Sequence, residues 1–144
     1  MLVEDVMSSP VVTGRPGMAI RDAIQRMEIE EIRHLPLVDE EGIMAVVSLR
    51  RLQDLIGAIR TLGGEAADYE GWVSQPIETI LETRFTQARD VIVTYPETKL
   101  SVAIDLFLEH KLTAIPVVED DDRPTPVGIV SYIDILEQFQ AGTL

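Results

Sequence analysis

The chain has 144 residues, enough for one compact domain or two small fused halves, and 46% of them are hydrophobic. It contains no cysteine, which excludes disulfides, thiolate metal sites and a cysteine nucleophile and fits a cytoplasmic location. A formal net charge of −13, no secretory signal and no long apolar run lead us to expect no binding to nucleic acid or to a membrane.

The first part of the chain predicts a β-α-β-β-α unit. A short strand, Val11–Thr13, precedes Pro16, and the following helix has apolar residues at helical spacing: Ile20, Ala23, Ile24 and Met27. Two apolar strands, Leu35–Val38 and Met44–Val47, flank the turn DEEG and predict a hairpin. A closing helix carries Leu49, Leu52, Leu55, Ile56 and Ile59.

Residues 62–76 contain Gly-Gly and an acidic stretch, and we interpret them as a connector. Trp72 lies in this segment. A lone aromatic residue usually serves packing, so we expect Trp72 to anchor the connector on the body rather than to bind a ligand.

The second part of the chain repeats the first. Pro96 and Pro116 stand 80 residues after Pro16 and Pro36, and Ser131 stands 83 residues after Ser48. The predicted elements are, in chain order, strand Val91–Val93, a helix with Thr98 as N-cap, strands Ile115–Val118 and Val127–Val130, and a closing helix that carries the apolar residues Tyr132, Ile133, Leu136 and Phe139. Helical crossovers favour parallel pairing and hairpins give antiparallel pairing, so the predicted fold class is α/β with mixed sheets.

The second copy ends in Ser131-x-x-Asp134, and the first has Arg51 where the aspartate would stand. Two interpretations of Ser131 and Asp134 are open. They form a capping box at the start of a helix, or they bind a ligand through helix amides and a carboxylate that accepts ribose hydroxyls. For Arg51 the alternatives are a side chain in solvent and a cation that holds phosphate.

The tandem arrangement resembles the cystathionine beta-synthase (CBS) domain pair, or Bateman module. The resemblance is carried by IRHLPLVDEEG (32–42) with AVVSLRRL (45–52), and by LTAIPVVE (112–119) with VGIVSYIDIL (127–136). The first copy departs from the family pattern at Ala45 and Arg51. The resemblance implies two motifs, 1–61 and 77–144, related by a pseudo-twofold axis and joined by 62–76 into one module.

The resemblance also implies two clefts that bind adenine nucleotides. Carried over by position, the main cleft uses these residues: Asp134, Ser131, Ile129, Thr13, Gly14, Arg33 and His34. The reciprocal cleft uses another set: Ser48, Arg51, Thr94, Thr113 and Ala114. The second set lacks both the aspartate and the Arg-His pair, so we expect one good site and one degenerate site. A purely structural role for His34, before a buried strand, remains an equal alternative.

We therefore expect a cytoplasmic regulatory module that binds AMP, ADP or ATP, with NAD or S-adenosylmethionine as further candidates, and that modulates a separate protein. The alternative is a ligand-independent scaffold. The sequence contains no recognisable set of catalytic residues and no metal-ligand spacing, so we expect neither an enzyme nor a required cofactor or metal. The helix after Thr98 has apolar residues outside its main stripe (Val102, Leu106 and Leu108) and, with the family habit, favours a homodimer.

Overall fold

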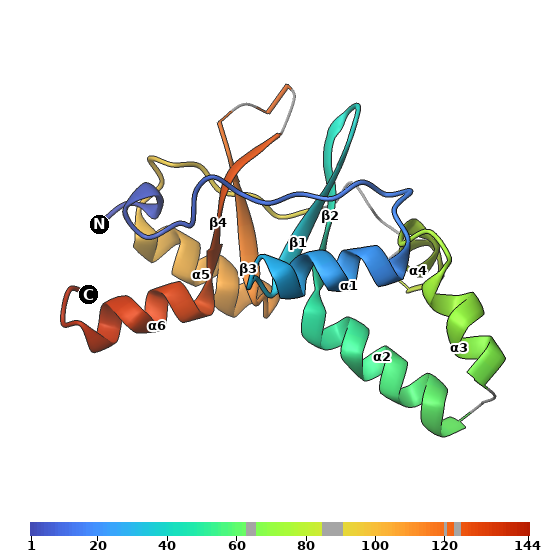
Figure 1. The fold of residues 1–144 in the computed structure, drawn as a ribbon. Helices are drawn as coiled ribbons and strands as arrows, with labels where there is room; N and C mark the ends of the chain where they lie inside the picture. The colour runs from blue at the N-terminus through green and yellow to red at the C-terminus, as the bar shows by residue number, and fades with distance from the viewer. Residues whose placement is uncertain (63–65, 85–90, 120, 123–124) are drawn as a thin grey trace. The chain divides into compact units, whose positions relative to one another are not determined.

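The computed structural model describes residues 1–62, 66–84, 91–119, 121–122 and 125–144 (Figure 1). The chain divides into two compact units. The first-repeat unit consists of Val12–Glu40 and Met44–Asp90, and the second-repeat unit consists of Met1–Val11, Glu41–Ile43 and Val91–Leu144. No helix in the described part of the chain is long and apolar enough to cross a membrane.

The first repeat contains two strands and the helices around them. In chain order the elements are α1 (Ile20–Ile29), β1 (His34–Asp39), β2 (Gly42–Ser48), α2 (Leu49–Leu62), α3 (Ala66–Val73) and α4 (Glu78–Arg84). Strands β1 and β2 form a two-stranded sheet. The core gathers the apolar stripe of α1 and the inward residues of both strands: Ile20, Ala23, Met27, Leu35, Leu37, Ala45, Val47, Leu52, Ile77 and Leu81.

The second repeat has the same plan. Its elements are a 3-10 turn η1 (Val3–Asp5), α5 (Leu100–His110), β3 (Ala114–Val118), β4 (Pro126–Ser131) and α6 (Tyr132–Gln140). Strands β3 and β4 pair antiparallel, from Ala114 opposite Ser131 to Val117 opposite Gly128. Their core is a separate cluster: Val3, Val6, Leu100, Ala103, Phe107, Ile115, Val117 and Val130.

The predicted strands Val11–Thr13 and Val91–Val93 are wrong as strands. Each copy makes only a single parallel bridge one residue later, Gly14 with Leu37 and Thr94 with Val117. In the first, the Gly14 amide donates to the Pro36 carbonyl at 2.9 Å. The next donor position of a parallel ladder falls two residues on, where Pro16 and Pro96 have no N–H, so neither ladder extends beyond the bridge toward the C-terminus.

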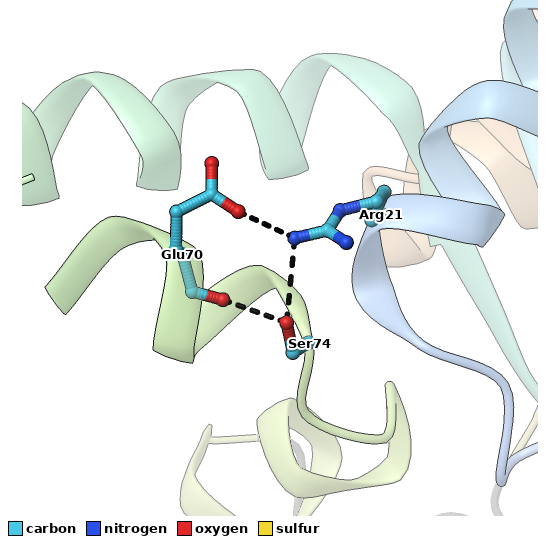
Figure 2. Close-up of polar contacts among 3 residues, drawn as sticks. All are labelled: Arg21, Glu70 and Ser74. Atoms are coloured by element: carbon cyan, nitrogen blue, oxygen red, sulfur yellow. Dashed lines mark hydrogen bonds and ion pairs between the residues drawn. The ribbon is translucent and has the colours of Figure 1, made fainter. Parts of the chain in front are cut away.

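The segment predicted as a plain connector contains a helix, α3, that packs against α1 and α2. Arg21 of α1 donates through Nη2 to Glu70 Oε2 at 2.7 Å and to Ser74 Oγ at 3.3 Å (Figure 2). The guanidinium of Arg60 lies 4.5 Å from the ring centroid of Tyr69. Trp72 is half-buried against the first-repeat core, as expected for an anchor.

The segments that precede the two repeats are exchanged between the units. In the second-repeat unit, the Val3 amide donates to the Thr98 carbonyl at 2.9 Å, and the N-terminal segment lies beside α5 (Figure 1). In the first-repeat unit, the Ile77 amide donates to the Met18 carbonyl at 2.8 Å. Each compact unit is therefore completed by the segment that the chain places before the other repeat.

Two details of the second-repeat helices differ from the prediction. Helix α5 has Lys99 as its N-cap, without a side-chain hydrogen bond, so the assignment of Thr98 as N-cap is wrong. Helix α6 buries no residue, and the four residues expected to pack inward are exposed: Tyr132, Ile133, Leu136 and Phe139. On α5, Leu106 packs partly against the core, and Val102 and Leu108 are exposed.

The acidic loop between β3 and β4 is tied to the body of its unit by Tyr95, whose hydroxyl donates to Asp121 Oδ1. This bond, with burial and the nearby negative charge, raises the pKa of Tyr95 above its ordinary value of 10.0. Because the folded-state pKa is raised, the bond stabilises the protein below about pH 10 and is lost as the pH rises through the raised value. We expect Tyr95→Phe to lower the free energy of unfolding at pH 8, and the deficit to shrink above about pH 10 in urea titrations. A deficit independent of pH would contradict this assignment.

Candidate functional site

The start of α6 is built by a reciprocal cap. Ser131 has an extended backbone (φ −112°, ψ 163°), and its Oγ accepts from the Asp134 amide at 3.2 Å. In return Asp134 Oδ2 accepts from the Ser131 amide at 2.7 Å and from Ser131 Oγ at 3.0 Å. The predicted capping box is confirmed, and it places a half-buried carboxylate at the positive end of a helix.

The start of α2 keeps only half of this arrangement. Ser48 Oγ accepts from the Arg51 amide at 3.3 Å, which matches the bond between Ser131 and Asp134. The Arg51 side chain has no oxygen with which to accept from the Ser48 amide. A cation also stands in the first turn, where the helix dipole favours an anion. The two repeats thus build the same helix start with opposite charge.

Each helix start is joined to the residue just before the preceding strand pair. The Leu49 amide donates to the Arg33 carbonyl at 2.9 Å, and the Tyr132 amide donates to the Thr113 carbonyl at 3.2 Å. Within one unit the structure therefore brings Arg33 to the start of α2 and Thr113 to the start of α6. The predicted main cleft instead combines Asp134 with Arg33, and the reciprocal cleft combines Arg51 with Thr113. That pairing stays a prediction.

The charges around the two helix starts differ accordingly. At α2 the exposed residues are Arg33, whose carbonyl accepts from the Leu49 amide, and Arg50 and Arg51 in the first helical turn. At α6 the corresponding positions hold Thr113, Ile133 and Asp134. In a chain with a net charge of −13, three arginines at one helix start are the stronger candidate for binding an anionic group. The α6 start is suited to accepting hydroxyl or amide donors.

The remaining predicted site residues lie in or next to the sheets. Gly14 is buried, and a Cβ built on it would lie 2.7 Å from Met18 Sδ and 2.9 Å from Leu35 Cδ2, so the ends of these two side chains would have to shift to admit a larger residue. Thr13 precedes it and is half-buried, as is His34 at the start of β1. Ala114 is buried at the start of β3, opposite Ser131.

Thr94 occupies the position in the second repeat that Gly14 occupies in the first, with equivalent backbone bonds to Pro116 and Val118. It is 1% exposed, and among the described residues its Oγ1 has no hydrogen-bond partner. The hydroxyl of Thr94 is therefore a buried polar group that no described residue satisfies.

Gly128 has a packing role that the sequence did not reveal. A missing side chain on a strand can leave room for a ligand. The structure fills that space from the N-terminal segment: a Cβ on Gly128 would lie 2.6 Å from Met7 Sδ and 3.0 Å from the Ser8 carbonyl oxygen. The next residue, Ile129, exchanges backbone hydrogen bonds with Ser8, at 2.8 and 3.1 Å. In the first repeat the equivalent residue is Ala45.

Comparison with known protein families finds the same two repeats. The family model of the CBS domain matches residues 3–58 and again residues 75–141. The chain belongs to the CBS domain family. The tandem pair of motifs inferred from the sequence is confirmed, and CBS domain pairs are generally regulatory parts of proteins.

Curated relatives and solved structures extend the match over the whole chain. Homoserine O-acetyltransferase of Methanohalophilus mahii is 29% identical over 143 residues, which are 99% of this chain and 25% of that protein. The CBS domain pair of protein MJ0100, solved with 5'-methylthioadenosine and S-adenosyl-L-methionine, is 24% identical with a TM-score of 0.73, covering 99% of this chain and 98% of that one. CBSX2, solved with AMP, is 19% identical with a TM-score of 0.69, covering 99% and 98%.

These structural likenesses establish the fold. The chain spans about a quarter of the length of the curated relative from Methanohalophilus mahii, so that protein's activity is not transferred to this chain. Within the described residues no group of three histidine, aspartate or glutamate side chains is placed to hold a metal ion. The acidic run of residues 119–122 includes Asp120, which lies outside the described residues.

Proposed function

We propose that this chain is a regulatory module that binds an adenine-containing ligand at the start of α6, with Asp134 accepting hydrogen bonds from its ribose. The observation that carries the proposal is the geometry of the cap. Both bonds accepted by the carboxylate use Oδ2. A ribose hydroxyl that approaches Oδ1 would therefore not have to break the cap.

Support also comes from structurally similar CBS domain pairs, which hold AMP or 5'-methylthioadenosine and S-adenosyl-L-methionine. The choice among AMP, ADP, ATP, NAD and S-adenosylmethionine is left to the experiment. The contribution of Ile129, Thr13, Gly14, Arg33 and His34 to the same site rests on the family resemblance. Gly14 and Ile129 already have packing and backbone roles, so substitutions there would mix folding with binding.

For the first repeat we propose a weaker site of different character. The start of α2 has no carboxylate at position 51 and carries Arg33, Arg50 and Arg51 instead. Such a site would favour the phosphate of a ligand over its ribose. Of the reciprocal set, Thr94 is buried and its Oγ1 has no partner among the described residues, and its place in the site rests on the family resemblance.

The test is a calorimetric titration with AMP, ADP, ATP, NAD and S-adenosylmethionine, comparing the wild type with Asp134→Asn. Asparagine keeps an oxygen that can cap the helix and loses the charged acceptor. A hydrogen bond to a charged group contributes about 1.5–3 kcal/mol, so we expect the dissociation constant of the preferred ligand to rise about 10- to 100-fold. The matched control is Glu137→Gln, which removes the same charge from the same helix and should bind like the wild type.

Two results would count against the proposal. If none of the five compounds binds the wild type, the chain is better described as a ligand-independent scaffold in which the serine and aspartate only cap α6. If a ligand binds and Asp134→Asn binds equally well, the ligand site lies elsewhere. Asp134→Ala should in either case lower the free energy of unfolding by about 1 kcal/mol, because the cap is lost.

We further propose that the chain forms a homodimer and acts on a separate protein. The exposed apolar residues Val102 and Leu108 of α5, together with those of α6, support an association surface. Binding would regulate the partner only if the ligand favours one arrangement of the module over another. Light scattering at micromolar concentration tests the homodimer directly.

A further inference from the structure

The side chain of Met7 fills the space that Gly128 leaves on β4. The position of the missing Cβ lies 2.6 Å from Met7 Sδ and 3.2 Å from Met7 Cγ, with the Ser8 carbonyl oxygen at 3.0 Å. Met7 is half-buried and packs against the core of the second-repeat unit. The thioether sulfur is therefore the atom that lies closest to the missing side chain, and an unbranched, flexible side chain suits such a narrow space.

Met7 also stands where the N-terminal segment joins β4. The next residue, Ser8, exchanges backbone hydrogen bonds with Ile129, at 2.8 and 3.1 Å, and forms an isolated bridge with it. Ser9 Oγ donates to the Val127 carbonyl at 3.0 Å. A pairing as short as one bridge depends on the side chain packed beside it. A change that displaces the Met7 side chain should therefore displace the chain at Ser8 and Ser9 as well.

The first repeat has a different pair of residues at the two equivalent positions. Ala45 stands where the second repeat has Gly128, and Leu81 stands where it has Met7. Both are buried in the core of the first-repeat unit. The fold of a repeat is thus compatible with an aliphatic pair that has no oxidisable atom. The thioether against a glycine is a property of the second repeat.

Methionine is the residue of this chain that a mild oxidant modifies, because the sequence has five methionines and no cysteine. With hydrogen peroxide, the sulfur lone pair forms an S–O bond as the O–O bond breaks. The proton on the transferred oxygen passes to the departing hydroxide, which leaves as water, so sulfur is oxidised to the sulfoxide and the peroxide is reduced. At Met7 the product would add a polar oxygen to a sulfur that already fills its space.

We propose that Met7 is a reversible site of oxidation by peroxide, and that its sulfoxide releases the chain at Ser8 and Ser9 from β4. A half-buried side chain leaves a small oxidant partial access. Release would free the edge of β4 at Ile129, two residues before the Ser131 cap. The inference goes beyond ligand binding and needs no nucleotide.

The first experiment treats the wild type with hydrogen peroxide and measures the sulfoxide at each methionine by peptide mass spectrometry. Met7 should be oxidised well before Met27, which is fully buried. In the same samples, amide exchange followed by NMR should become at least about 10-fold faster at Ser8 and Ile129, because a polar group buried without a partner opposes the packing. Methionine sulfoxide reductase should restore slow exchange.

A second site on the same segment shows whether the release is local. The Val3 amide donates to the Thr98 carbonyl at 2.9 Å, upstream of Met7. It should keep its protection in the oxidised protein. Loss of protection at Val3 together with Ser8 and the centre of β3 would indicate general unfolding and overturn a local release.

The matched variants remove the sulfur at one position each. Met7→Leu places the first-repeat residue at this position, and exchange at Ser8 should then not respond to peroxide. Met7→Leu combined with Gly128→Ala transfers the whole first-repeat pair and should be equally unresponsive. The control is Met18→Leu. Met18 is also half-buried, with its Sδ 2.7 Å from a Cβ built on Gly14, but it belongs to the first-repeat unit, so this variant should respond like the wild type.

Three further results would overturn the proposal. If Met7 is oxidised no faster than Met27, it is not a site for peroxide. If Met7 is oxidised and exchange at Ser8 and Ile129 stays as slow as before, its sulfoxide does not release the segment. If exchange in Met7→Leu responds to peroxide as much as in the wild type, the response comes from another methionine.

Discussion

Gly128→Ala is expected to destabilise the protein by about 1–3 kcal/mol, the range for adding a methyl group to a filled space. The added Cβ would lie 2.6 Å from Met7 Sδ and 3.0 Å from the Ser8 carbonyl oxygen. The methionine side chain can move aside, but the carbonyl belongs to backbone that is hydrogen-bonded to Ile129 on β4. We expect the N-terminal segment to be displaced from β4 while the pairing of β3 with β4 remains.

Urea denaturation gives the change in stability, and amide hydrogen exchange locates it. The amides of Ser8 and Ile129, which bond to each other's carbonyls, should lose protection in Gly128→Ala ahead of those in the centre of β3. Gly57→Ala is the control, because a Cβ there meets nothing within 4 Å and alanine is favoured in a helix. It should stabilise the protein slightly. An unchanged stability and unchanged protection in Gly128→Ala would show that the segment does not press on the strand.

The repeat itself could be predicted because its signals are local and occur twice. Paired prolines, helical spacing of apolar residues and two apolar strands around a turn set the order of elements, and β1, β2, β3 and β4 are all found. The Ser131 and Asp134 cap could also be predicted, because a capping box needs only four consecutive residues. Such features depend on backbone geometry over one or two turns of chain.

The parts that could not be predicted depend on contacts between distant segments. The segments VEDVM (3–7) and IETIL (77–81) precede the two repeats and are similar in sequence, but neither sequence indicates that the segment completes the unit of the other repeat. The reason for glycine at 128 and alanine at 45 follows from that exchange. The end of pairing after Gly14 and Thr94 could have been anticipated, since Pro16 and Pro96 follow two residues later and remove the next donor.

The outer face of α6 was missed for a related reason. A helical stripe of apolar residues predicts that one face is covered, and it does not say by what. For α2 the cover comes from the same chain, through α3 and contacts such as Arg60 with Tyr69. For α6 the stripe lies on the side away from its unit. An amphipathic pattern therefore predicts the helix correctly but does not predict which surface its apolar face contacts.

Thr94→Val is expected to stabilise the protein, by about 1–2 kcal/mol, because leaving a buried hydroxyl unpaired costs about 1–3 kcal/mol. Thr94 is 1% exposed, and within the described part of the chain its Oγ1 has no hydrogen-bond partner. Valine has nearly the same shape and no polar atom, and its branched Cβ suits the extended backbone of the parallel bridge. The backbone bonds of residue 94 to Pro116 and Val118 do not involve the side chain and should remain.

The control for this substitution is Thr61→Val in α2. Thr61 is exposed, and its Oγ1 donates to the Gly57 carbonyl at 2.8 Å, so the same change removes a satisfied hydroxyl and should be neutral or slightly destabilising. If Thr94→Val instead lowers the free energy of unfolding by more than Thr61→Val does, the hydroxyl has a partner such as a buried water. If it weakens nucleotide binding at unchanged stability, Thr94 contacts the ligand as the family resemblance implies. A gain in stability with unchanged binding would show that Thr94 is a buried residue without a role in the ligand site.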